Sequence, residues 1–170
     1  MGRGGIRPLE FKTFSKEMQN AITNYCQAGG NFFVSGAYVA SDLWDNRLVK
    51  ANEEDKKFAM EVLKYKWRVG QAARNGKVKS VASPFPEITG SSTYYQDLNP
   101  ESYVVESPDA LEPAAQGAFT ILRYSENNLS AGIAYKGNYK TCVLGFPFEA
   151  IRTVTERELL MKAILTFFEH

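Results

Sequence analysis

The sequence predicts an α/β fold of three layers, α/β/α, whose mixed sheet has a parallel core and an antiparallel C-terminal extension. Three observations predict it. A helical pattern ends in two glycines and leads directly into a short apolar strand, which is half of a βαβ unit. Three runs of β-type pattern lie in the last third of the chain, and an apolar helix closes it. Because 170 residues suffice for one core, we expect a single domain over 1–170, with an irregular segment at 1–14.

The first predicted element is a helix over residues 15–28, with Ser15 as its N-cap. Apolar side chains recur along it at helical spacing, and Gly29 and Gly30 provide the C-terminal stop. Residues 31–34 follow as a short, almost wholly apolar strand. Such a strand is typical of a parallel sheet that is covered on both faces.

A second helix is predicted over residues 52–63, where Asn52 and Asp55 have the spacing of a capping box. Glu53 and Glu54 join Asp55 in its first turn. We interpret these acids as complements of the helix dipole, and a paired-carboxylate catalytic site is the alternative.

The middle of the chain predicts a hairpin around the turn Asn75-Gly76, with strands near 67–73 and 77–82. Prolines and glycines interrupt every pattern in 84–102, which we therefore expect to be a loop. A short strand at 103–105 follows, and Pro108 and Pro113 then bracket another loop.

The last third of the chain predicts an antiparallel meander, because only short turns separate its three strands. These strands are expected at 119–124, 130–135 and 140–146. A helix from about 156 to 169 follows, with Thr155 and Glu158 as its capping box. Its broad apolar face indicates that it packs on the sheet.

Composition and cysteine usage exclude several function classes. The formal net charge is +1, which argues against an electrostatically driven nucleic-acid or membrane binder. No apolar run is long enough to span a bilayer, and the first residues contain no signal-peptide core. Cys26 and Cys142 lie in apolar contexts, so we expect two buried free thiols, with a disulfide as the alternative. His170 is the only histidine, so we expect no metal site, and we expect no cofactor.

Two segments resemble a known family. They are YCQAGGNFFVSGAYVASD at 25–42 and LGFPFEAI at 144–151, the latter followed by RELLMKAILTFF at 157–168. Together they resemble the class I glutamine amidotransferase-like domain, of flavodoxin-like architecture, found in secreted multidomain proteins classed as xanthan lyases. The resemblance implies a secreted, periplasmic or cell-surface protein. It also implies that two βα units of that domain are missing ahead of the first helix, so an uncovered sheet edge is available for self-association.

The resemblance also implies where a site would lie. Amidotransferases place a cysteine nucleophile at the elbow after a strand, where this chain has Gly36, Ala37 and Tyr38, with Ser35 just before. Their His-Pro-Glu stretch corresponds to FPFE at 146–149, so Pro147 replaces the histidine and only Glu149 is left. Nucleophile and base are both absent, and the glutaminase reaction is therefore not expected.

Three functions remain open for this chain. The first is a non-catalytic accessory or interaction domain of a secreted glycan-processing protein, whose partners are the other domains of that protein. The second is a carbohydrate-binding module, in which loop aromatics stack on the sugars of a polysaccharide or oligosaccharide.

The third function is a polysaccharide lyase or hydrolase, with Tyr38 and either Arg47 or Lys50 in the reaction. We leave the question of an enzyme open and favour a domain that is not catalytic by itself. The candidate ligand-binding residues are Ser35, Gly36, Tyr38, Asp42, Trp44 and Glu149, with Tyr94, Tyr95, Asp45 and Asn46 as further loop candidates.

Overall fold

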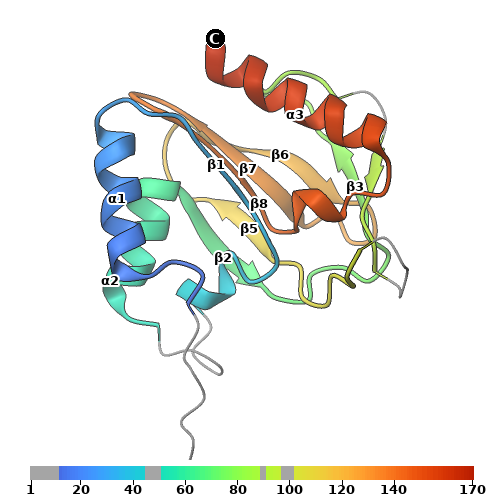
Figure 1. The fold of residues 1–170 in the computed structure, drawn as a ribbon, viewed down its shortest axis with the longest axis horizontal. Coiled ribbons are helices and arrows are strands. Elements are labelled where there is room, and N and C mark those ends of the chain that lie inside the picture. The colour runs from blue at the N-terminus through green and yellow to red at the C-terminus, as the bar shows by residue number, and fades with distance from the viewer. Residues whose placement is uncertain (1–11, 45–50, 89–90, 97–101) are drawn as a thin grey trace, which may run out of the picture.

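The fold is built on one large curled sheet, seen in Figure 1 in a computed structural model that describes residues 12–44, 51–88, 91–96 and 102–170. Six strands form this sheet in the order β1-β8-β7-β6-β3-β4, and β2 and β5 form a second, two-stranded sheet. The strands are β1 Phe32–Ser35, β2 Tyr65–Val69, β3 Lys77–Ser80, β4 Ser91–Thr93, β5 Ala110–Pro113, β6 Ala118–Tyr124, β7 Ser130–Lys136 and β8 Lys140–Leu144. The helices are α1 Lys16–Gln27, α2 Glu53–Lys57, which Phe58–Leu63 continues as a π-helical segment, and α3 Val154–Glu169.

The predicted three-layer α/β/α class with a parallel core is wrong. Among the described strands only β1 and β8 pair in parallel, and every other pairing is antiparallel. The result is a β-rich, curled mixed half-barrel with three helices, 31% helix and 28% strand. The physical reason is that the helix–Gly-Gly–strand unit contributes one parallel strand, whereas short turns join β6, β7 and β8 and therefore force antiparallel pairing.

The N-terminal helix and strand form largely as predicted. The Ser15 hydroxyl accepts from the Met18 amide at 3.3 Å, and Gly29 has the left-handed φ of +89° that ends α1. The predicted burial of the strand on both faces is wrong, since β1 is the edge strand and all four of its residues are half-buried.

The capping box of the second helix is confirmed. The Asp55 amide donates to the Asn52 side chain at 2.8 Å, and the Asn52 amide donates to the Asp55 carboxylate at 3.0 Å. The helix ends at Lys64, which adopts a left-handed φ of 68°.

The predicted hairpin around Asn75 and Gly76 is wrong. Gly76 does adopt a left-handed φ of +63°, but β2 pairs with β5, and β3 pairs with β4 and β6. Distant contacts hold the intervening chain instead, because the Ala72 amide donates to the Pro108 carbonyl at 2.8 Å and the Arg74 amide to Glu126 at 2.8 Å. Two expected loops contain strands, since β4 lies within 84–102 and β5 lies in the segment that Pro108 and Pro113 bracket. The strand expected at 103–105 does not form.

The C-terminal meander β6-β7-β8 is confirmed, and α3 follows it. The capping box of α3 uses Thr153 and Glu156 and not the predicted pair two residues later. The segment before α3 is held as far as Arg152, whose amide donates to the Thr93 carbonyl at 2.8 Å. Thr153 is therefore the first threonine that can cap the helix.

Two hydrophobic clusters lie on opposite faces of the sheet, one with α3 and one with α1 and α2. Along β8, Cys142 belongs to the α3 cluster and Val143 to the other. Cys26 belongs to the α1 cluster, so the sheet separates the two cysteines. Both are buried free thiols, as predicted.

Candidate functional site at the rim of the sheet

A shallow hollow lies at the rim of the sheet, where β1 and β8 end. Its volume is about 330 Å³. Three chain segments line this rim hollow: residues 36–38 after β1, residues 103–106, and Pro147 after β8. The carboxyl ends of strands are the usual position for ligands in sheets with a parallel pair. The rim hollow is therefore the candidate site.

The segment after β1 brings Tyr38 into the rim hollow. The Gly36 amide donates to the Leu144 carbonyl at 3.3 Å, which ties the turn to the end of β8. Tyr38 then has a φ of 63°, a left-handed conformation that costs a bulky residue roughly 1 kcal/mol or more. Its side chain is 36% exposed, so an aromatic ring faces solvent at the rim.

The buried carboxylate of Asp109 holds this segment from beneath. Its Oδ2 accepts from the Ala40 amide at 2.8 Å and from the Ser41 amide at 3.0 Å, and its Oδ1 accepts from the Trp67 indole at 3.1 Å. Burial raises the pKa of Asp109 to about 6, although these donors favour the charged form. The Tyr65 hydroxyl adds a bond to the Val39 carbonyl at 2.7 Å.

Asp109 also joins the end of β8 through its main chain. Its amide donates to the Gly145 carbonyl at 2.6 Å, and its carbonyl accepts from the Tyr124 hydroxyl at 2.8 Å. A Cβ on Gly145 would lie 2.0 Å from the Asp109 carbonyl oxygen, so the contact requires glycine. Sequence reasoning missed Asp109, which it placed in a loop. The one available signal is an acidic residue directly ahead of the apolar pair that begins β5.

Ser35 and Glu149 border the rim hollow and have different hydrogen-bond partners. The Ser35 hydroxyl accepts from the Phe148 amide at 3.1 Å. The Glu149 carboxylate accepts from the Tyr103 hydroxyl at 2.6 Å. Burial, together with the Glu149 carboxylate, raises the pKa of Tyr103. The hydroxyl and the carboxylate are thus each engaged in a separate hydrogen bond.

The other candidate residues that the structure describes do not line the rim hollow. Asp42 accepts from the amide of Thr13 at 3.1 Å and from its hydroxyl, and Trp44 packs half-buried on the α1 cluster. Tyr94 is fully buried and stacks on Phe146 at 4.9 Å. Tyr95 lies against Arg152, and Asp45, Asn46, Arg47 and Lys50 lie outside the described residues.

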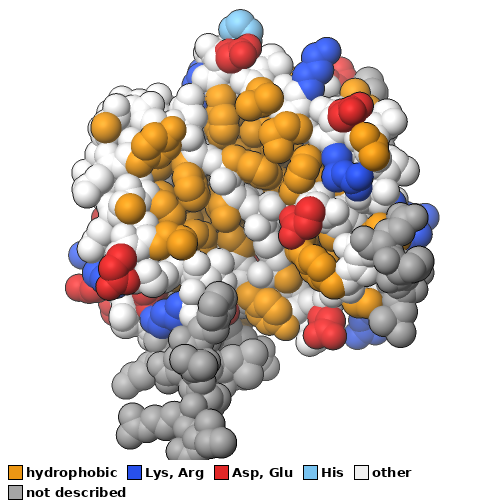
Figure 2. Space-filling model, viewed as in Figure 1, with side chains coloured by type: hydrophobic (Ala, Val, Ile, Leu, Met, Phe, Trp, Pro, Cys, Tyr) orange, Lys and Arg blue, Asp and Glu red, His pale blue; other side chains and the backbone are white. Residues whose placement is uncertain are grey.

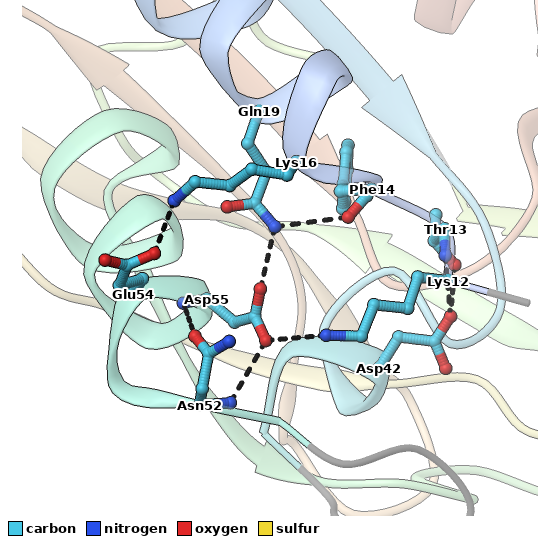
Figure 3. A network of polar contacts seen from close by, with 9 residues as sticks. All are labelled: Lys12, Thr13, Phe14, Lys16, Gln19, Asp42, Asn52, Glu54 and Asp55. Atoms are coloured by element: carbon cyan, nitrogen blue, oxygen red, sulfur yellow. Dashed lines mark hydrogen bonds and ion pairs between the residues drawn. The ribbon is translucent and has the colours of Figure 1, made fainter. Parts of the chain in front are cut away.

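A second polar cluster lies between α1 and α2, and Figure 3 shows its contacts. The buried carboxylate of Asp55 accepts from Lys12 at 2.9 Å and from Gln19 at 2.8 Å, besides the Asn52 amide of the capping box. Burial works against its charge, but the bonds from Gln19 and Lys12 hold the pKa of Asp55 below its usual range. The Gln19–Asp55 and Lys16–Glu54 contacts join α1 to α2, so this cluster holds the two helices together.

The side chains that line the rim hollow are aromatic, apolar and acidic. Within 12–44, 51–88, 91–96 and 102–170, no group of histidine, cysteine and acidic side chains could hold a metal ion. No helix in that part of the chain is long and apolar enough to cross a membrane. The rim hollow combines two partly exposed tyrosine rings, apolar side chains and the carboxylates of Glu106 and Glu149.

Comparison with known proteins identifies a shared fold only. No family model matches the sequence, and no curated protein matches it. The chain is similar in structure to part of the cold-adapted β-galactosidase from Rahnella sp. R3, with a TM-score of 0.60 and 13% identity over 91% of this chain. It spans 21% of the length of that β-galactosidase chain. The likeness agrees with a β-rich mixed fold in place of the predicted three-layer class.

Proposed function

We propose that this chain is a non-catalytic accessory domain of a secreted glycan-processing protein, and that the rim hollow is its binding surface. The observation that carries the proposal is the hydrogen bonding of Ser35 and Glu149. Ser35 accepts from the Phe148 amide and Glu149 accepts from the Tyr103 hydroxyl, and neither of these bonds joins a nucleophile to a base. A surface with exposed rings and engaged polar groups is suited to binding.

The test is turnover by the intact protein. We expect the unmodified protein and its Ser35→Ala and Glu149→Gln variants to be indistinguishable in assays of glutamine, β-galactoside and acidic polysaccharide cleavage. Circular dichroism establishes that both variants fold. A loss of kcat in either folded variant would contradict the proposal.

Tyr38 and Tyr103 favour a sugar as the ligand. They come from separate segments, line the same rim hollow and are 36% and 53% exposed. Aromatic faces of this kind pack against the apolar faces of sugar rings, while Glu106 and Glu149 offer acceptors to hydroxyl groups. The fold shared with part of a β-galactosidase, an enzyme of glycans, supports this second candidate function.

Calorimetric titration with neutral and acidic oligosaccharides tests the candidate function. Tyr38→Asn removes one ring at a left-handed position that asparagine tolerates, and Tyr103→Phe keeps the other ring but removes its bond to Glu149. We expect at least tenfold weaker binding for Tyr38→Asn and a smaller loss for Tyr103→Phe. The matched control is Tyr25→Ala, which removes an exposed ring from α1. Absence of binding to every oligosaccharide would overturn the sugar assignment.

A further inference from the structure

The outer edge of β1 offers unpaired main-chain groups. β1 ends the strand order and pairs with β8 alone among the described strands. Because the Gly36 amide donates to Leu144 and peptide directions alternate along a strand, the N–H and C=O groups of Phe33 and Ser35 point away from β8. In Figure 1, β1 runs in front of the sheet between α1 and α3.

This edge is short, but it lacks three other features that prevent strand pairing. Edge strands usually carry a charged side chain, a proline or a bulge. The sequence of β1, FFVS, contains no charge and no proline, and its register with β8 is regular. The strand is therefore open to a further strand.

Apolar side chains surround the edge on both faces of the sheet. Figure 2 shows hydrophobic side chains gathered on the side that carries β1, between α1 and α3. On α1, the exposed Tyr25 lies beside Gly30, just ahead of β1, since its ring is within 2.6 Å of the Cβ position of Gly30. The exposed Met18 lies two helical turns earlier on the same side of α1. Patches of this kind mark interaction surfaces.

The flank of α3 contributes to the same patch. Phe167 contacts Phe119 of β6 at 6.1 Å between ring centroids, so one flank of α3 faces β6. Met161 and Leu165 lie outside the buried row of α3 and line a surface hollow on this helix, and Leu165 is 53% exposed. The main-chain carbonyl of Phe168 accepts from the Asn31 side chain at 3.1 Å, which places this end of α3 beside the start of β1.

We propose that β1 pairs antiparallel with β1 of a second copy of this chain, about a two-fold axis at Val34. This register places Phe33 opposite Ser35 of the other copy, and each such pair exchanges two main-chain hydrogen bonds. The groups that bond in this register are the outward-pointing ones of the free edge.

The side chains of β1 favour its own copy over another strand. Read against itself about Val34, the segment FFVSG places Phe33 opposite Ser35 and Phe32 opposite Gly36. Each large ring thus meets a small residue on the same face of the joined sheet. The strand is uncharged and the net charge is +1, so no strong repulsion opposes two copies. The Met18 and Tyr25 flanks of the two copies lie on one face, and the Leu165 flanks lie on the other.

Sedimentation velocity and cysteine cross-linking test the proposal on the full chain. In the proposed register Val34 faces Val34 of the other copy as a non-hydrogen-bonded pair. The Cα atoms of such a pair in antiparallel strands are about 4.5 Å apart, which permits a disulfide. We expect a two-fold mass in sedimentation at micromolar concentration and an intermolecular disulfide in Val34→Cys under mild oxidation. The matched control is Val69→Cys on β2, a strand of the other sheet, which should not cross-link. The native Cys26 and Cys142 are buried and do not compete.

Both measurements have outcomes that overturn the proposal. A chain that sediments as a monomer at every concentration would do so. A dimer whose Val34→Cys variant is folded by circular dichroism but does not cross-link would also overturn it, because another surface would then join the copies.

Discussion

Two buried carboxylates, Asp55 and Asp109, hold two regions of this molecule in different ways. Asp55 lies between α1 and α2 and has a cation, Lys12, at 2.9 Å. Asp109 lies beneath the rim hollow, and its side-chain partners are main-chain amides, the hydroxyl of Ser41 and the indole of Trp67. The pKa of Asp55 is held below its usual range, whereas that of Asp109 is raised to about 6.

The difference shows how desolvation competes with hydrogen bonds and a neighbouring cation at a buried carboxylate. Burial opposes the charge on both carboxylates. At Asp55 the hydrogen bonds and Lys12 outweigh this cost, whereas at Asp109 neutral donors do not. Asp109 therefore fixes the segment that carries Tyr38 while its own ionisation lowers the stability of the fold. We take the hydrogen bonds that the Asp109 carboxylate accepts beneath the rim hollow as the central feature of the molecule.

Removal of the Asp109 carboxylate should have the largest effect on the free energy of unfolding. Asp109→Ala leaves the amides of Ala40 and Ser41 and the Trp67 indole without their acceptor, and we expect a loss of about 4 kcal/mol in the free energy of unfolding. Urea unfolding measures it. The control is Glu106→Ala, an exposed acid at the rim hollow, which should change stability by less than about 0.5 kcal/mol. A loss below about 1 kcal/mol for Asp109→Ala would show that Asp109 does not hold the segment.

The pH dependence of stability should have opposite signs at the two carboxylates. Because the folded pKa of Asp109 is raised, the folded state binds its proton more tightly, so its contribution is present below about pH 4 and is lost as pH rises through 6. Relative to Asp109→Asn, the unmodified protein should lose about 3 kcal/mol between pH 4 and pH 7. Asp55, whose folded pKa is lowered, contributes stability above its unfolded pKa and loses it as pH falls. Unfolding series across pH check both signs, and a rise for Asp109 over this interval would refute the assignment.

Loss of the cation at Asp55 should have a smaller effect. Lys12→Met leaves the buried carboxylate with Gln19 and Asn52, so we expect about 2 kcal/mol of destabilisation at pH 7. The comparison variant is Lys16→Met, which removes an exposed pair with Glu54 and should cost less than about 0.5 kcal/mol. Equal effects of the two substitutions would mean that burial adds nothing to the Asp55 pair.

The left-handed residue at the rim should have the smallest effect. Tyr38→Asn relieves backbone strain at a φ of 63° and should raise the free energy of unfolding by about 0.5 kcal/mol. Thermal unfolding detects such a rise. A destabilisation would indicate that the Tyr38 ring packs on the rim more than its exposure suggests.

The sequence predicted the caps of the first two helices and the C-terminal meander, because contacts between residues close in sequence determine them. Ser15 and the Asn52–Asp55 box cap their helices through contacts within three residues. The short turns of β6, β7 and β8 likewise determine their order. The α3 box was misplaced because TVTERE contains two T-x-x-E patterns, and only the distant bond from Arg152 to Thr93 selects the first.

Long-range pairings could not be predicted in the same way. β2 and β5 are far apart in sequence, and no feature of either segment identifies the other, so a plausible local turn at Asn75 was read as a hairpin. At the site, Gly36 and Tyr38 line one hollow, and Ser35 and Glu149 lie beside it; the site that the resemblance implies there stays a prediction. Asp42 and Trp44 were candidates because they lie in a predicted loop and suit sugar binding; in the structure Asp42 accepts from Thr13, and Trp44 packs on the α1 cluster.

The most direct test of the role of Asp109 is an NMR titration of carboxyl-labelled aspartate. The Asp109 resonance is assigned as the one that is missing in the Asp109→Asn variant. We expect the Asp109 carboxyl to titrate with a midpoint near 6, and the amides of Ala40 and Ser41 to shift with the same midpoint. A midpoint near the ordinary aspartate value, with the two amides unchanged across that range, would contradict the account.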